Sequence, residues 1–147
     1  MYNRILLISF LSWVSSLLCK TIIFWIVNKR FDPKRCLGDG GMPSNHSAVV
    51  TALATAIGLQ CGMDSPVFAV ATVFAIIVMH DAMGVRQETG KQARVINNML
   101  QLFESMGRGD LTPDEALKEF VGHTGRQVIV GAILGILMAL LLHSVLP

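Results

Sequence analysis

Long apolar segments constrain this chain more than any other feature of its sequence. A helix that crosses a bilayer needs about 20 mostly apolar residues. Ile5–Val27, Val128–Leu146 and a segment from Ser65 to Met79 or slightly beyond are good candidates. A fourth segment, Ser47–Cys61, is short and rich in alanine, threonine and glycine. Because only the sequence QCGMDSP joins it to the next span, we predict that it also crosses the membrane, with small residues that permit close helix packing.

The composition places the chain among membrane proteins. Hydrophobic residues make up 52% and charged residues 15% of the 147 residues, whereas soluble domains carry roughly 25% charged residues. We therefore expect one all-α, membrane-embedded domain spanning residues 1–147, with about four transmembrane helices. The net charge of +2 and the lack of a basic helix with interleaved aromatics argue against nucleic-acid binding. Three cysteines without CxxC spacing predict neither a zinc site nor a disulfide framework.

The positive charges predict the orientation. With four spans, both termini and the Gln60–Pro66 turn lie on one side, and the Asn28–His46 and Arg86–Arg126 segments lie on the other. Ten of the twelve lysines and arginines fall on that second side: Lys29, Arg30, Lys34, Arg35, Arg86, Lys91, Arg94, Arg108, Lys118 and Arg126. Because cytoplasmic loops carry the excess of positive charge, we expect a bacterial plasma-membrane protein with these segments in the cytoplasm.

The segment Thr89–Met106 has apolar residues at helical spacing and polar residues between them. This pattern predicts an amphipathic helix on the cytoplasmic membrane surface. The sequence GRGD then ends the helix, and TPDE resembles a capping box, with Thr112 as N-cap, Pro113 at the first helical position and Glu115 reaching back. We expect this segment to act mainly as a connector that seals the bundle.

The most polar turn, GGMPSNHS, directly precedes the short apolar segment. Gly41 permits backbone conformations that point N–H groups inward, and Ser44 or Asn45 can cap a helix that begins near His46. Backbone N–H groups at a helix N-terminus bind anions. An ordinary helix cap would explain Ser44 and Asn45, but it would not explain the adjacent His46.

Two further polar groups lie at the predicted cytoplasmic ends of spans. In MHDAMGVR, Asp81 is costly near hydrocarbon unless it is paired, and Arg86 can bind two phosphate oxygens; the two side chains could also simply pair with each other. In GHTGRQVIVG, His123 and Gln127 are four residues apart and would share a helix face. Two histidines, an arginine and a glycine-rich turn on one membrane face suit phosphoryl transfer.

These motifs, in this order, resemble a known superfamily. GGMPSNHSA is similar to the PSGH signature of the type-2 phosphatidic acid phosphatases, relatives of acid phosphatases and vanadium haloperoxidases. GHTGRQVIVGAILG is similar to their H-x-x-x-D-V-x-x-G signature, and DAMGVRQETGKQA resembles the divergent branch of the superfamily. The resemblance covers roughly Lys20 to Leu137. It implies that His123 is a nucleophile that forms a phosphohistidine, that His46 is the general acid, and that no metal or other cofactor takes part.

The sequence also departs from the superfamily pattern. Asn45 replaces the glycine of PSGH, and Gln127 replaces the aspartate that orients the nucleophile. We expect Asp81 to bond His123 or to hold Arg86 in its phosphate-binding pose. The usual upstream lysine–arginine–proline motif is not recognisable, and Lys20, Lys29 or Arg35 could replace it. The predicted phosphate-binding residues are Gly41, Ser44, Asn45, Arg86, Lys20 and Gln127.

The expected function is a metal-independent lipid phosphatase that hydrolyses a phosphomonoester headgroup at the cytoplasmic interface. Its substrate would be of the phosphatidylglycerophosphate or phosphatidate class, since such lipids are made on that leaflet. Two alternatives stay open: a polyprenyl diphosphate phosphatase, and a non-catalytic membrane protein that binds anionic lipid or a partner. The expected partners are a lipid phosphate and membrane lipids, and homo-oligomerisation stays open.

Overall fold

The described part of the chain is helical. A computed structural model describes residues 3–29, 41–107, 117 and 122–146. Within these ranges the chain forms five helices and no strand: α1 (Arg4–Asn28), α3 (Asn45–Cys61), α4 (Pro66–Met83), α5 (Val85–Ser105) and α6 (Gly125–Val145). Each of the four predicted spans forms a helix, α1, α3, α4 or α6, within a few residues of its expected bounds.

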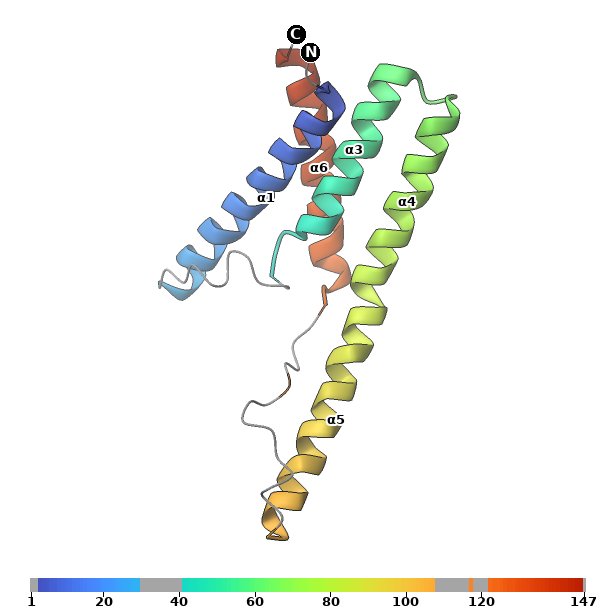
Figure 1. Cartoon of the computed structure of the whole chain (residues 1–147). Coiled ribbons are helices and arrows are strands. Elements are labelled where there is room, and N and C mark those ends of the chain that lie inside the picture. The colour runs from blue at the N-terminus through green and yellow to red at the C-terminus, as the bar shows by residue number, and fades with distance from the viewer. Residues whose placement is uncertain (1–2, 30–40, 108–116, 118–121, 147) are drawn as a thin grey trace.

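These four helices form one bundle with alternating directions. The two chain ends lie at the same end of the bundle as the turn between α3 and α4 (Figure 1). The two long connecting segments therefore begin and end at the opposite end, as the four-span topology predicts. Helices α1 and α6, and the continuous helical run through α4 and α5, are long and apolar enough to cross a membrane. Helix α3 is shorter, at 17 residues, and it packs against α1, α4 and α6.

Side-chain caps fix where the helices begin. Asn3, Ser44 and Ser65 precede α1, α3 and α4, and each side chain accepts a hydrogen bond from a backbone N–H in the first turn. Such caps satisfy N–H groups that have no partner within the helix. At the end of the bundle that holds the two termini, the Arg4 guanidinium donates to the carbonyls of His143 and Leu146. This contact ties the beginning of α1 to the end of α6.

The core is built from small residues. Ala52, Ala56 and Ala139 are at most 1% exposed and pack with Ile8 where α1, α3 and α6 meet. A Cβ atom at Gly135 would overlap the carbonyl oxygen of Ala48 and the hydroxyl of Thr51. Helices α3 and α6 therefore approach each other at their backbones, as small residues allow in membrane proteins.

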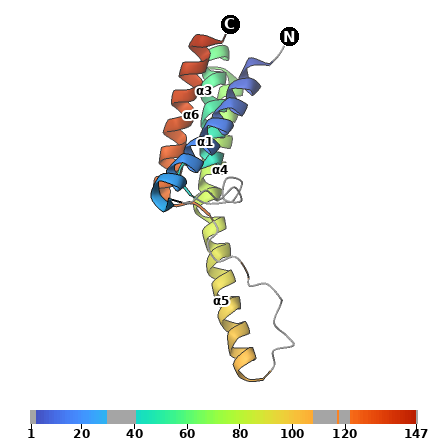
Figure 2. The ribbon, with the colours of Figure 1, turned by 90° about the vertical axis from the view of Figure 1, so that its left-hand side faces the viewer.

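Helix α5 differs from its predicted placement. It begins at Val85, earlier than expected, and continues α4 beyond the end of the bundle (Figures 1 and 2); we expected it to lie along the membrane surface. The backbone explains the difference. Gly84 donates to the His80 carbonyl at 2.9 Å, and its own carbonyl accepts from Gln87 at 3.0 Å, so no break in the hydrogen bonds redirects the chain. Thr112, Pro113 and Glu115, the predicted capping box, lie outside the described residues.

The close crossing of α3 and α6 generates a stability prediction. Gly135→Ala should destabilise the protein by about 1–3 kcal/mol, the usual cost of overpacking a core, because Ala48 contributes rigid backbone at that point. Thermal unfolding of the detergent-solubilised protein, followed by size-exclusion chromatography of heated samples, measures this effect. Gly125→Ala is the matched control, since a Cβ there meets only the Met83 sulfur at 3.8 Å. Equal melting temperatures for the two variants would contradict the close crossing.

Candidate functional site

The polar residues singled out in the sequence gather at the end of the bundle opposite the two termini. Helices α3 and α6 both begin there, and α4 ends there (Figure 1). The N-termini of α3 and α6 therefore bring two positive helix ends to one region. This is the end at which an anion would be stabilised.

Two histidines meet at this end. His46 lies in the first turn of α3, and His123 lies two residues before α6. Their ring centroids are 5.9 Å apart, and the rings meet edge to face at an interplanar angle of 61°. His123 is only 3% exposed, and His46 is half-buried. Residues 77 positions apart in the sequence are thus brought into contact, as the two motifs predict.

The backbone of His123 is anchored on both sides. Its N–H donates to the carbonyl of Ala82 at 2.9 Å, and its carbonyl accepts from the side-chain amide of Gln87 at 2.8 Å. Gly122, just before it, has φ of +97°, a conformation that glycine adopts without strain. Sequence reasoning missed Gln87, since a glutamine at the start of a polar helix carries no distinctive signal.

Gln127 orients the ring of His123 and caps α6 at the same time. Its Oε1 accepts from the backbone N–H of Thr124 at 3.0 Å and contacts Nδ1 of His123 at 3.2 Å. A backbone N–H can only donate, so the atom facing Thr124 is the amide oxygen. Since that oxygen cannot donate, Nδ1 must carry the hydrogen of the neutral ring. The ring lone pair then lies on Nε2.

Ser44 joins the two helix starts. Its hydroxyl oxygen accepts from the hydroxyl of Ser47 at 3.0 Å and from the Ser47 N–H at 3.4 Å. Its backbone N–H donates to the carbonyl of Gln127 at 3.1 Å, and the residue is fully buried. Ser44 is therefore the N-cap of α3, one of the two residues predicted for it. Its contact with phosphate stays a prediction.

Helix α1 supplies a polar stripe to the site. Ser12, Ser16 and Lys20 are spaced four residues apart and are all buried. Ser12 donates to the carbonyl of Ala48 at 3.2 Å, and Ser16 donates to Oδ1 of Asn45 at 2.9 Å. Asn45, predicted to bind phosphate, is thus bonded to α1. Sequence reasoning overlooked the two serines, although polar residues repeated every four positions in an apolar helix are a recognisable signal.

Lys20 lies against the glycine-rich turn. It is 7% exposed, and a Cβ added at Gly41 would come within 3.1 Å of its Cε. Gly41 also has φ of +89°, so both its conformation and its lack of a side chain let the lysine approach the turn. Of the three basic residues proposed to replace the missing upstream motif, Lys20 is held next to the turn that precedes α3. Lys29 is exposed at the end of α1, and Arg35 lies outside the described residues.

The two remaining predicted residues, Asp81 and Arg86, lie on either side of the junction between α4 and α5. Asp81 is half-buried in the last turn of α4, next to Ala82, which anchors His123. Gln127 supplies the acceptor at Nδ1 of His123. The predicted bond from Asp81 to His123 or to Arg86 stays a prediction. Arg86 is in the first turn of α5, and its side chain lies outside the described part of the structure.

The arrangement offers groups for phosphate chemistry. It combines two imidazoles, a buried ammonium group on Lys20 and the beginnings of two helices. Among the described residues, no three histidine, cysteine, aspartate or glutamate side chains gather where they could hold a metal ion. Nitrogen nucleophiles, proton donors and cations are groups that can take part in phosphoryl transfer.

Comparison with known proteins identifies the family of the chain. The chain is 39% identical over 148 residues to YuiD, an uncharacterized membrane protein of Bacillus subtilis (strain 168), with 95% of this chain and 94% of YuiD covered. No solved structure matches. A family model described as the divergent PAP2 family matches residues 1–138, which include both histidine motifs. The chain is an integral membrane protein that belongs to the divergent PAP2 family.

Proposed function

We propose that this protein is a metal-independent phosphatase that hydrolyses the phosphomonoester headgroup of a membrane lipid. The observation that carries this proposal is the contact between His46 and His123, with Gln127 at Nδ1 of His123. This hydrogen bond directs the lone pair of the neutral His123 ring to Nε2, the nitrogen that would attack phosphorus. Membership of the divergent PAP2 family supports the same chemistry.

In the first step, Nε2 of His123 attacks the phosphorus atom and forms an N–P bond. The ester P–O bond breaks, and the leaving oxygen takes a proton from the imidazolium form of His46, which becomes neutral. The centroid distance of 5.9 Å is short enough for both rings to contact one phosphate group bound beside them. Lys20 and the N–H groups at the start of α3 would stabilise the negative charge on the phosphate oxygens.

In the second step, water replaces the histidine. Neutral His46 takes a proton from a water molecule, whose oxygen attacks phosphorus as the N–P bond breaks. Inorganic phosphate leaves, His46 is again protonated, and the electron pair of the N–P bond returns to Nε2. The hydrogen bond from Nδ1 to Gln127 holds the ring in one orientation through both steps.

The placement of the site supports a lipid substrate. The histidines lie at one end of a bundle whose helices are apolar enough to cross a membrane, so a phosphate carried by a lipid can reach them from the bilayer surface. We assign the site to the cytoplasmic side because ten of twelve basic residues fall in the segments at this end. Phosphatidate and phosphatidylglycerophosphate are phosphomonoester lipids of the required type.

Substitution of the histidines tests the reaction. His123→Asn should lower phosphate release from phosphatidate by at least ~10³-fold, as expected for loss of a nucleophile. His46→Asn should lower it by ~10²–10⁴-fold, the contribution of a general acid. The wild-type rate should persist in EDTA and fall with vanadate. His143→Asn, at the other end of α6, is the matched control. Loss of activity in EDTA, or full activity of His123→Asn, would overturn the mechanism.

The tautomer of His123 can be measured without an activity assay. In ¹⁵N-histidine NMR spectra of the solubilised protein, neutral His123 should carry its hydrogen on Nδ1, because Gln127 Oε1 accepts there. Gln127→Glu keeps the acceptor and should keep this tautomer, whereas Gln127→Leu should shift the population towards the Nε2–H form. The resonances that disappear in His123→Asn identify the residue. An Nε2–H tautomer in the wild type would contradict the predicted attacking nitrogen.

The native Cys61 tests the orientation. It is exposed at the end of α3, at the opposite end of the bundle from the histidines. In a variant with Cys19 and Cys36 replaced by serine, a membrane-impermeant maleimide should label Cys61 in intact cells. The further change Cys61→Ser should abolish the label. Labelling that requires permeabilised cells would place the histidines on the outer face instead.

A further inference from the structure

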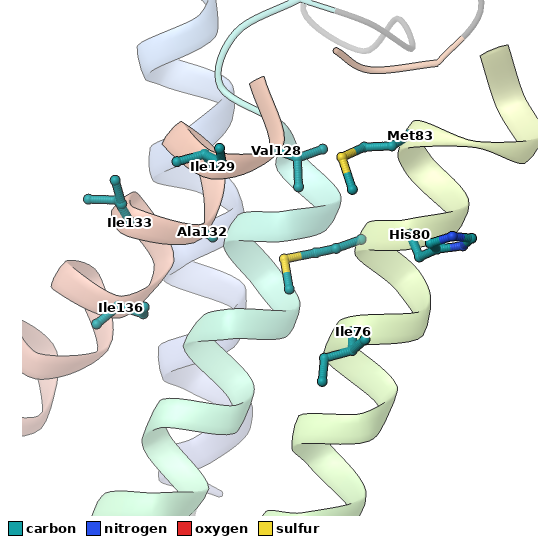
Figure 3. Close-up of a pocket in the computed structure, with 9 residues that line it drawn as sticks. Ile76, His80, Met83, Val128, Ile129, Ala132, Ile133 and Ile136 are labelled. Atoms are coloured by element: carbon teal, nitrogen blue, oxygen red, sulfur yellow. The ribbon is translucent and has the colours of Figure 1, made fainter. Parts of the chain in front are cut away.

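An apolar groove separates α4 from α6 on the side of the bundle shown in Figure 3. Its volume is about 440 Å³, within the range of pockets that hold small ligands. Ile76, Met79 and Met83 of α4 line one wall, and Val128, Ala132 and Ile136 of α6 line the other. The ring of His80 points away from α6 (Figure 3), so the lining between the helices is made of apolar side chains.

One end of this groove adjoins the histidine site. Met83 and Val128 point toward each other there (Figure 3). Met83 follows Ala82, whose carbonyl binds the backbone of His123, and Val128 follows Gln127, which contacts the ring of His123. The residues that hold the histidine and the residues that begin the groove are therefore direct neighbours on both helices. The groove therefore begins one residue along each helix from the contacts of His123.

The length and chemistry of the groove fit a hydrocarbon chain. From Met83 to Ile76 and from Val128 to Ile136 it follows about two helical turns, or roughly 11 Å along the helices. Both helices are apolar enough to cross a membrane, so in a bilayer the groove would lie along the hydrocarbon layer. Its open side lets a chain enter sideways from the bilayer.

We propose that the groove between α4 and α6 binds an acyl chain of the lipid whose phosphate occupies the histidine site. This inference rests on the proposed phosphatase function and adds a specificity element to it. The site would select a phosphate attached to a membrane-embedded chain over a water-soluble phosphomonoester, because only the former gains contacts in the groove.

Two adjacent isoleucines provide a matched test. Ile76 lines the groove, whereas Ile77 does not, and they are 58% and 60% exposed. The wild-type protein in nanodiscs should hydrolyse long-chain phosphatidate with a higher kcat/KM than glycerol 3-phosphate. Ile76→Trp should lower the ratio of these two values by at least ~10-fold, the scale of a lost apolar pocket contact, and Ile77→Trp should change it less than ~2-fold. Equal effects of the two variants, or no preference for the lipid, would overturn the inference.

Cross-linking tests the groove independently of turnover. A phosphatidate with a diazirine in its acyl chain should label residues 76–83 and 128–136 of the wild type. Ile76→Trp should reduce this labelling, and Ile77→Trp should leave it unchanged. Uniform labelling of all lipid-facing helices would mean annular lipid only and would reject the groove as a binding site. If neither substrate is hydrolysed, the proposed reaction fails, and the cross-linking pattern still decides whether the groove binds the chain.

Discussion

The close crossing of α3 and α6 is the contact on which the rest of the structure depends. Gly131 and Gly135 bring the backbone of α6 against Ser44 and Ala48 of α3, and the Ser44 N–H bonds the carbonyl of Gln127. Because α3 begins at this contact, the crossing fixes His46 relative to the residues that precede α6. In a bilayer, where hydrophobic association between helices is weak, such packing of small residues is the main source of helix adhesion. Stability and site geometry therefore share one interface.

The sequence predicted the spans because their signals are strong and local. Apolar length indicated three of them, and the short QCGMDSP link to the next span indicated the fourth. The pairing of His46 with His123 followed from topology, since both motifs precede spans that run in the same direction. The direction of α5 could not be predicted from the sequence. Amphipathic periodicity shows which face of a helix is apolar, but it contains no information on the angle to the preceding helix. That angle depends on the unbroken hydrogen bonds around Gly84.

The contacts within the site were harder to predict than its members. From the sequence, Lys20 was one of three basic residues that could replace the missing upstream motif. The choice among them depends on which face of α1 meets the turn at Gly41. Ser12 and Ser16 lie on that same face, and their spacing from Lys20 would have identified it. Gln127 was expected to share a face with His123, and the structure adds that the oxygen that contacts His123 also accepts the Thr124 N–H. Such double use of one atom cannot be read from spacing.

The exchange of aspartate for Gln127 has an electrostatic consequence for the proposed reaction. A carboxylate at this position would stabilise positive charge on the His123 ring, but it would also repel an approaching phosphate dianion. The glutamine keeps the acceptor and removes the negative charge, so the ring is oriented without that repulsion. In the proposed reaction, the buried Lys20 and the two helix N-termini would stabilise the negative charge on the phosphate oxygens.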